Sequence, residues 1–211
     1  MCRMLGFISR KPISVEIFFP ALLKMAKEGK NSPHSDGFGV CAVKNGKITV
    51  YKEIHPIWDR SRDFRNIVGN VGILHARKAS WMKASILCTH PFVRGFKCFA
   101  HNGKIEDFAE KCDSRELFNM IIEEGVKSLR KIRKASSLTF IMAENGKLTV
   151  CRYAVEKEEY YTLYEGYVDD ILVVSSEPLD ENFSEITNYT MVEYSLKDGR
   201  IDRREEKLCF R

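Results

Sequence analysis

The sequence predicts an α+β domain in which helices lie on the faces of antiparallel sheets. Two observations carry this prediction. Asn-Gly or Asp-Gly separates paired, alternating strand-like runs at three places, which is the signature of β-hairpins, and two segments carry apolar residues at helical spacing. The 211 residues suit a single domain over 1–211 with a sizeable core.

Six stretches predict the strands of this domain. Buried strands are expected where apolar residues run continuously, and hairpins are expected where a tight-turn dipeptide joins two alternating runs. The expected strands are 2–8, 70–77 and 169–176, and the expected hairpins are 38–53, 138–154 and 191–206.

Two stretches predict the helices. Residues 14–29 have a helical pattern, with a kink expected at Pro20 and an end at Gly29. Residues 113 to about 134 give the strongest helical pattern of the chain. Helices inserted between hairpins are expected to pack on the outer faces of the sheets.

Charge and composition argue against nucleic-acid and membrane partners. The net charge is +5, and the densest basic run, 127–135, falls at a predicted helix end, where the helix dipole favours cations. No aromatic residues interleave with this run to stack on bases. The longest apolar runs are too short to span a bilayer and the start of the chain lacks a secretory pattern, so we expect a cytoplasmic protein.

The cysteines and histidines predict neither a disulfide framework nor a metal site. The seven cysteines are odd in number and show no C-x-x-C spacing, which favours reduced and mostly buried thiols. The spacings of His34, His75, His90 and His101 do not match those of metal-ligand motifs. We therefore expect no metal and no cofactor.

Four short stretches contain residues able to carry chemistry. HSDGFGV (34–40) has the composition of a glycine-rich loop leading into a hairpin. GILHARKAS (72–80) predicts a buried strand that ends at Arg77, whose guanidinium could bind a carboxylate bidentately. The third stretch is CTHPF (88–92).

The fourth stretch, FAHNGKI (99–105), has two readings. Asn102-Gly103 is a tight-turn dipeptide and so predicts a fourth hairpin. Alternatively, such a turn can aim an asparagine amide and a glycine N–H at one point, and two convergent donors form an oxyanion hole.

Together with the opening MCRMLGF, these motifs in this order resemble the class II glutamine amidotransferases, which are N-terminal-nucleophile hydrolases. The resemblance is closest to the small stand-alone members, and VVSSEPL (173–179) extends it toward the end of the chain. It implies a four-layer αββα sandwich of two antiparallel sheets with helices outside.

The resemblance implies catalytic roles for three residues. Cys2 would be the nucleophile once Met1 is removed. Its own α-amino group, with a pKa near 7.7–8, would accept the thiol proton. Asn102 and the Gly103 N–H would hold the oxyanion.

The resemblance also implies substrate-binding roles. Arg77 would bind the α-carboxylate of glutamine, with Ser80 as a second contact, and Asp113 would bind the α-ammonium. The sequence around Asp113 is D-S-R-E, with Arg115 inserted relative to the family's D-S-E. Because D-x-x-E is also a capping-box pattern, Asp113 as a plain helix N-cap is the alternative.

The activity implied is hydrolysis of the side-chain amide of glutamine to glutamate and ammonia through a Cys2 thioester. Because the domain is expected to fill the chain, ammonia would pass to a partner subunit, or the enzyme would act as a plain amidohydrolase. Two alternatives stay open. The substrate could be another γ-glutamyl amide or peptide, or the chain could be a catalytically idle regulatory or binding subunit, which retention of Met1 would favour.

Overall fold

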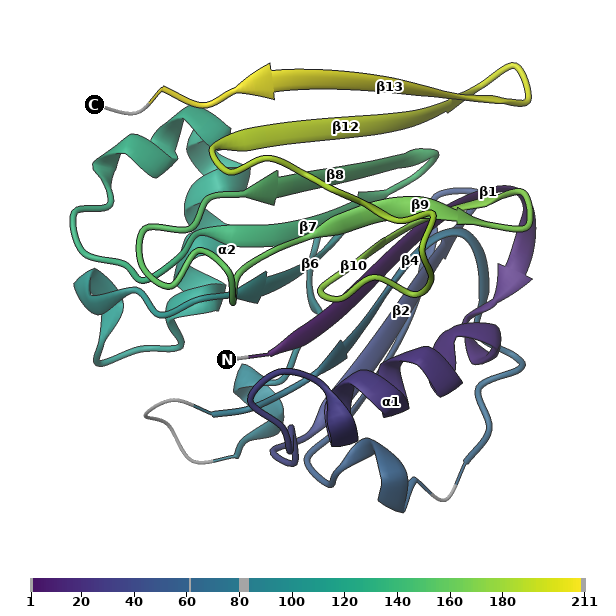
Figure 1. Ribbon diagram of the computed structural model, residues 1–211, viewed down its shortest axis with the longest axis horizontal. Coiled ribbons are helices and arrows are strands. Elements are labelled where there is room, and N and C mark those ends of the chain that lie inside the picture. Colours follow the sequence, from purple (N-terminus) through teal and green to yellow (C-terminus); the bar gives the residue numbers. More distant parts are fainter. Residues whose placement is uncertain (1, 61, 80–83, 210–211) are drawn as a thin grey trace.

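The computed structural model describes residues 2–60, 62–79 and 84–209, which form two antiparallel β-sheets lying face to face (Figure 1). Within these residues, sheet A has seven strands and sheet B has six. The strands of sheet A, in spatial order, are β11 (Ser184–Glu185), β9 (Tyr164–Val168), β10 (Ile171–Ser175), β1 (Arg3–Ser14), β4 (Val68–Ala76), β2 (Phe38–Lys44) and β3 (Lys47–Glu53). Those of sheet B are β13 (Arg200–Lys207), β12 (Thr190–Lys197), β8 (Lys147–Arg152), β7 (Thr139–Glu144), β6 (Lys97–Asn102) and β5 (Phe92–Arg94).

The three predicted hairpins are confirmed as the pairs β2–β3, β7–β8 and β12–β13. Each turns at its Asn-Gly or Asp-Gly dipeptide, and both residues of the first turn have positive φ, 50° at Asn45 and 74° at Gly46. The alternative fourth hairpin at Asn102-Gly103 is wrong. There the chain leaves β6 and enters an isolated bridge between Ile105 and Ala135.

Both predicted helices are shorter than their sequence patterns. The first is divided into a 3₁₀ turn, η1 (Val15–Phe18), and the helix α1 (Phe19–Glu28). Pro20 does not kink this helix, because it lies in the first turn, where its missing N–H has no partner to lose. The second is α2 (Asp113–Glu124), which ends at Gly125 with φ 78° and is followed by η5 (Val126–Lys131).

Short 3₁₀ turns complete the chain between the strands. They connect elements rather than contribute a layer of their own. They are η2 (Ile57–Asp59), η3 (Ile86–Cys88) and η4 (Glu106–Phe108).

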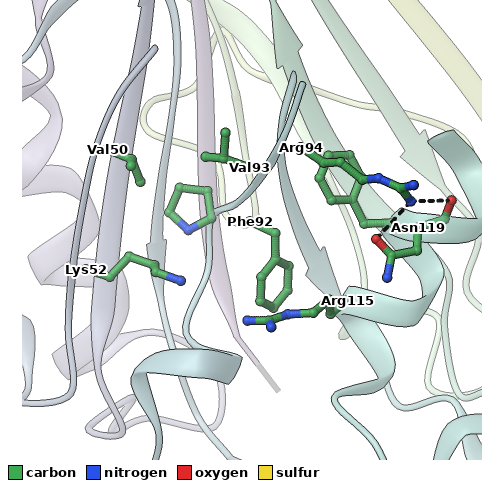
Figure 2. A pocket seen from close by; sticks show the side chains of 9 residues that line it. Val50, Lys52, Phe92, Val93, Arg94, Arg115 and Asn119 are labelled. Carbon is green, nitrogen blue, oxygen red and sulfur yellow. Dashed lines mark hydrogen bonds between the residues drawn. The ribbon is translucent and has the colours of Figure 1, made fainter. Parts of the chain in front are cut away.

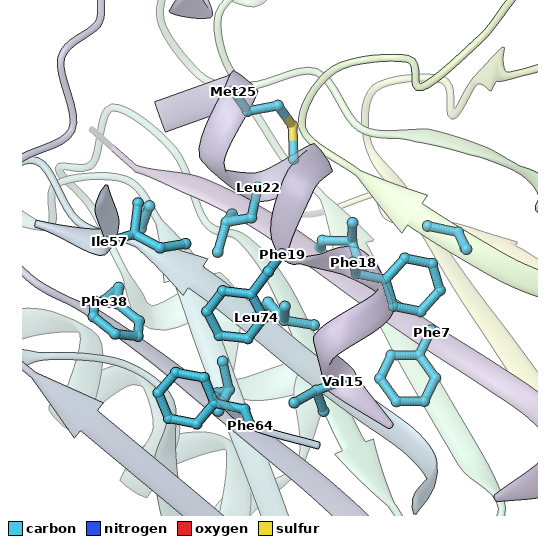
Figure 3. Close-up of a cluster of buried hydrophobic side chains, with 14 of the residues drawn as sticks. Phe7, Val15, Phe18, Phe19, Leu22, Met25, Phe38, Ile57, Phe64 and Leu74 are labelled. Carbon is cyan, nitrogen blue, oxygen red and sulfur yellow. The ribbon is translucent and has the colours of Figure 1, made fainter. Parts of the chain in front are cut away.

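Three apolar cores define four layers. The first core lies between α1 and sheet A, where Phe19 stacks on Phe64 with ring centroids 4.8 Å apart (Figure 3). The second lies between the two sheets, and the third lies between sheet B and α2. Because each sheet buries both faces, the order of layers is α1, sheet A, sheet B, α2. None of the helices in the described ranges has the length and apolar character needed to cross a lipid bilayer.

Candidate active site

Cys2 lies immediately before β1, at one end of the space between the sheets. Arg3 of β1 pairs with Ala76 of β4, so extending the antiparallel register by one residue places Cys2 opposite Arg77. Paired residues share a face of the sheet, and this face is the one turned toward sheet B. The Cys2 side chain is 8% exposed, and its sulfur lies 3.9 Å from the carbonyl oxygen of Lys78.

Asn102 ends β6 and contacts Cys2 from the opposite sheet. Its Oδ1 accepts a hydrogen bond of 2.8 Å from the backbone nitrogen of Cys2, although the two residues are 100 positions apart in sequence. The residue is 1% exposed, and we find no hydrogen bond from its Nδ2 to any other described residue. The bond to Oδ1 therefore fixes the amide and leaves its donor nitrogen available beside the thiol.

Gly103 follows Asn102 where the chain passes very close to the segment at Ser137. A Cβ atom on Gly103 would lie 2.1 Å from the Ser137 carbonyl oxygen and 2.7 Å from His101 Nε2. His101 secures the turn, because its Nε2 donates to the Ser137 carbonyl at 3.0 Å and its Nδ1 bonds the Ser114 hydroxyl at 2.9 Å. In the part of the chain that the structure describes, the Gly103 N–H donates no hydrogen bond.

Arg77 is a buried cation without an anion. Its side chain is 7% exposed, Nη1 has no hydrogen-bond partner, and no described carboxylate forms an ion pair with it. The loop HSDG holds its backbone, because Arg77 N–H donates to Gly37 at 2.8 Å and Asp36 N–H donates to Arg77 at 3.0 Å. The Asp36 carboxylate also accepts from the Ala79 N–H at 2.8 Å. The loop that sequence reasoning left without a role thus fixes the strand end that carries the guanidinium.

Most of the buried side-chain atoms that lack hydrogen-bond partners lie at this end of the molecule. The ring centroids of His75 and His90 are 4.2 Å apart, and neither ring has a hydrogen-bond partner among the described residues on either nitrogen. The Nε2 of His34 and the hydroxyl of Tyr160 are also buried and have no hydrogen-bond partner within the described ranges. Buried polar groups are normally hydrogen-bonded, so a concentration of exceptions indicates a place where a polar ligand or water binds.

Burial keeps these histidines neutral. It lowers the pKa of His75 well below the ordinary value, and the neighbouring Arg77 charge lowers that pKa further. Burial also lowers the pKa of His90 well below the ordinary value, and the neighbouring His75 lowers it further. The pKa of His34 falls to about 3, mainly through burial. The Arg77 guanidinium, and not an imidazolium, therefore carries the positive charge at this position.

Sequence reasoning missed the contacts that hold the start of β1. Arg3 is fully buried, with its Nε 2.9 Å from a carboxylate oxygen of Glu177 and its guanidinium 4.8 Å above the ring of Tyr160. Glu177 also accepts from the backbone N–H of Lys30 at 2.8 Å. The available signal was an arginine inside an apolar strand pattern, because a buried cation requires a partner.

Ser176 holds the next residue of β1. Its hydroxyl accepts from the Met4 N–H at 2.8 Å, and its own N–H donates to the Met4 carbonyl at 2.9 Å. Together with the Arg3 contacts, these bonds fix the backbone directly behind Cys2. The VVSSEPL segment is thus a support for the first strand.

Asp113 lies near the turn that follows Gly103 rather than at a helix cap. Its carboxylate accepts from the backbone N–H groups of Ile105 at 3.0 Å and Ser114 at 2.7 Å, so it connects the start of α2 to the chain just after Gly103. The N-cap alternative is wrong, because Asp113 is the first helical residue and Cys112 occupies the cap position.

Met1 and Ser80, to which the sequence analysis gave a role, lie outside the described residues. Of the remaining predicted site residues, the structure brings Cys2 and Asn102 into contact and places Arg77 beside Cys2. Among the residues described, no group of three or more His, Cys, Asp or Glu side chains is placed to hold a metal ion.

Comparison with known proteins identifies the family of this chain. Residues 1–121 match the family model of class-II glutamine amidotransferases, and the chain therefore belongs to that family. A Haemophilus influenzae protein named as a glutamine amidotransferase is 30% identical over 122 residues, which cover 54% of this chain and 40% of the relative. The glutamine–fructose-6-phosphate aminotransferase (isomerizing) of Francisella tularensis is 30% identical over 130 residues, which cover 60% of this chain and 19% of that enzyme.

Solved structures share the whole fold. The glutamine phosphoribosylpyrophosphate amidotransferase of B. subtilis superposes with a TM-score of 0.75 at 16% identity, over 100% of this chain and 50% of that one. A glutamine aminotransferase class-II domain protein from Silicibacter pomeroyi superposes with a TM-score of 0.66 at 18% identity, over 98% of this chain and 99% of that one. The four-layer sandwich expected from the family resemblance is thereby confirmed. The matched region spans less than half the length of the curated relatives.

Proposed function

We propose that this chain hydrolyses the side-chain amide of glutamine to glutamate and ammonia through a thioester on Cys2. The observation that carries the proposal is the pairing of two unusual groups at one end of the inter-sheet space. A buried thiol at the start of the chain lies next to a buried guanidinium that has no anion among the described residues. An amino-acid substrate supplies the carboxylate that such a guanidinium lacks.

In the proposed reaction, removal of Met1 converts the Cys2 nitrogen into an α-amine. That nitrogen already donates to Asn102 Oδ1, so the amine is held beside its own thiol and can take the thiol proton. The sulfur attacks the amide carbon, and Asn102 Nδ2 and the Gly103 N–H stabilise the oxyanion. The C–N bond breaks, the amine returns a proton to the leaving ammonia, and water then hydrolyses the thioester to glutamate.

Three further residues complete the proposed substrate site. Arg77 binds the α-carboxylate, and Asp113, whose carboxylate lies beside the turn after Gly103, faces the α-ammonium. Ser80 is a second contact in this proposal. In this proposal the ammonia passes to an acceptor protein or is released.

The test is an assay of glutamate release from glutamine beside a panel of γ-glutamyl amides and γ-glutamyl peptides. Cys2→Ser should abolish release and leave the fold intact, whereas Cys209→Ser, which changes an exposed thiol, should retain it. Turnover of a γ-glutamyl peptide in preference to glutamine would redirect the proposal to that substrate. The absence of release from every substrate by the processed protein would favour an idle binding subunit.

A further inference from the structure

A cavity of about 340 Å³ opens between the edge strands β3 and β5 and the first turns of α2 (Figure 2). Its volume is at the lower end of the range for small-molecule sites. The walls combine apolar side chains, among them Val50 and Val93, with the ring of Phe92 and three cationic side chains. None of the described residues assigned to glutamine hydrolysis lines it.

Two of the cations, Lys52 and Arg115, converge on Phe92 from different elements. The Lys52 ammonium lies 5.5 Å from the ring centroid and the Arg115 guanidinium lies 5.2 Å from it. Both side chains are half-buried, and neither forms an ion pair with any described carboxylate, although the Arg115 guanidinium donates to the neutral backbone carbonyl of Leu87. Burial lowers the pKa of Lys52, and the nearby Arg115 charge lowers it further. The fold therefore holds two like charges close together over one aromatic ring, and among the described residues no carboxylate is paired with either of them.

The third cation shows what a paired arginine looks like in the same cavity. Arg94 lies 2.8 Å from a carboxylate oxygen of Glu123 and donates to Asn119 Oδ1 at 3.1 Å. The ion pair with Glu123 offsets its charge, and the hydrogen bonds to Asn119 fix its orientation (Figure 2). The contrast indicates that the unneutralised pair, Lys52 and Arg115, faces a ligand that the protein does not itself provide.

We propose that this cavity binds a small phosphate monoester, with the phosphate between Lys52 and Arg115 and the apolar body against Phe92 and Val93. A dianion offsets both charges, and guanidinium matches phosphate oxygens bidentately. The cations lie inside a cavity with apolar walls, which favours a compact ligand with one charged end. The inference goes beyond glutamine hydrolysis and does not depend on it.

The binding test uses phenyl phosphate and inorganic phosphate, with benzyl alcohol as the uncharged analogue, in titration calorimetry on the full chain. Phenyl phosphate should bind at one site, more tightly than inorganic phosphate, and benzyl alcohol should not bind. Lys52→Gln and Arg115→Gln should each weaken phenyl phosphate about tenfold or more, because each removes a charge-assisted contact. Lys47→Gln on the same strand β3 and Arg133→Gln, both exposed, should leave the affinity within about twofold.

Equal affinity in all four variants, no saturable binding of either phosphate compound, or equal binding of benzyl alcohol would overturn the proposal. A second readout separates a ligand site from a structural pair. Without ligand, Lys52→Gln should keep or raise the Tm, because it removes a half-buried charge that Arg115 repels. A clear fall in the Tm, with Lys47→Gln unchanged, would show that Lys52 serves the fold and would also overturn the proposal.

Discussion

Strands β1 and β4 send apolar side chains into the inter-sheet space over most of their length and polar ones at a single end. On β4, Val71 and Ile73 pack in the core between the sheets, and the same face then continues with His75 and Arg77. The apolar side chains are fully buried, whereas the polar end holds buried nitrogens that have no hydrogen-bond partner among the described residues. One face of one strand thus stabilises the fold at one end and, at the other, presents groups that only a ligand would satisfy.

Of the substitutions that test this comparison, loss of the proposed oxyanion donor should have the largest effect. Asn102→Ala removes the proposed donor and the bond to the Cys2 nitrogen, and should lower kcat for glutamate release about 100- to 1,000-fold. Steady-state kinetics of glutamate release measure the change in kcat. As a control in the apolar core that these strands face, Leu148→Ala on β8 should cost about 2–5 kcal/mol of unfolding free energy and leave the KM for glutamine unchanged. An Asn102→Ala enzyme with wild-type kcat would refute the oxyanion role.

Arg77 and Arg152 offer a comparison between an unpaired and a paired buried arginine. Arg77→Lys should raise the KM for glutamine about 10- to 100-fold with little change in Tm, because a point charge cannot replace the guanidinium fork. Arg152 is 2% exposed and forms an ion pair with Glu185. Arg152→Lys should lower stability by about 1–3 kcal/mol and leave the KM unchanged. A reversed pattern, in which Arg77→Lys destabilises and Arg152→Lys affects KM, would contradict the assignment.

The buried histidines should make stability depend on pH below neutrality. Folding lowers the pKa of His34 from 6.5 to about 3, so between these values the unfolded chain binds a proton that the folded protein excludes. Unfolding free energy should therefore fall as pH drops below about 6.5, by up to about 1.4 kcal/mol per pH unit for each such histidine. Denaturant melts at several pH values measure the slope.

A matched pair of variants separates the contribution of the histidine to the pH dependence of the unfolding free energy from that of the carboxylates. His34→Gln should flatten the slope, while His55→Gln, a change at an exposed side chain, should not. Identical slopes for wild type and His34→Gln would show that His34 is not held neutral by burial.

The sequence predicted the hairpins well because their turns are local. Asn45-Gly46 requires positive φ at both residues, and few other dipeptides tolerate it. The lengths of the helices were predicted less well. Apolar spacing continues past Gly125, but a glycine with φ 78° ends the hydrogen-bonding pattern of α2 there.

The candidate site was predicted through motifs and could not have been assembled from local patterns alone. The contact between Cys2 and Asn102 joins two sheets across 100 positions, so it depends on the tertiary fold. The support that Glu177 gives Arg3 was missed for the same reason, since the two residues are distant in sequence. An arginine in an apolar strand predicts that a partner exists but does not identify it.

The most direct test of the central claim is the dependence of glutamate release on the free α-amine of Cys2. Intact-mass analysis distinguishes chains with and without Met1, and an aminopeptidase that removes methionine converts one preparation into the other. Release from glutamine should rise in proportion to the fraction of processed chains and should be absent when all chains keep Met1. Equal release before and after processing would contradict a mechanism in which Cys2 supplies both the nucleophile and its base.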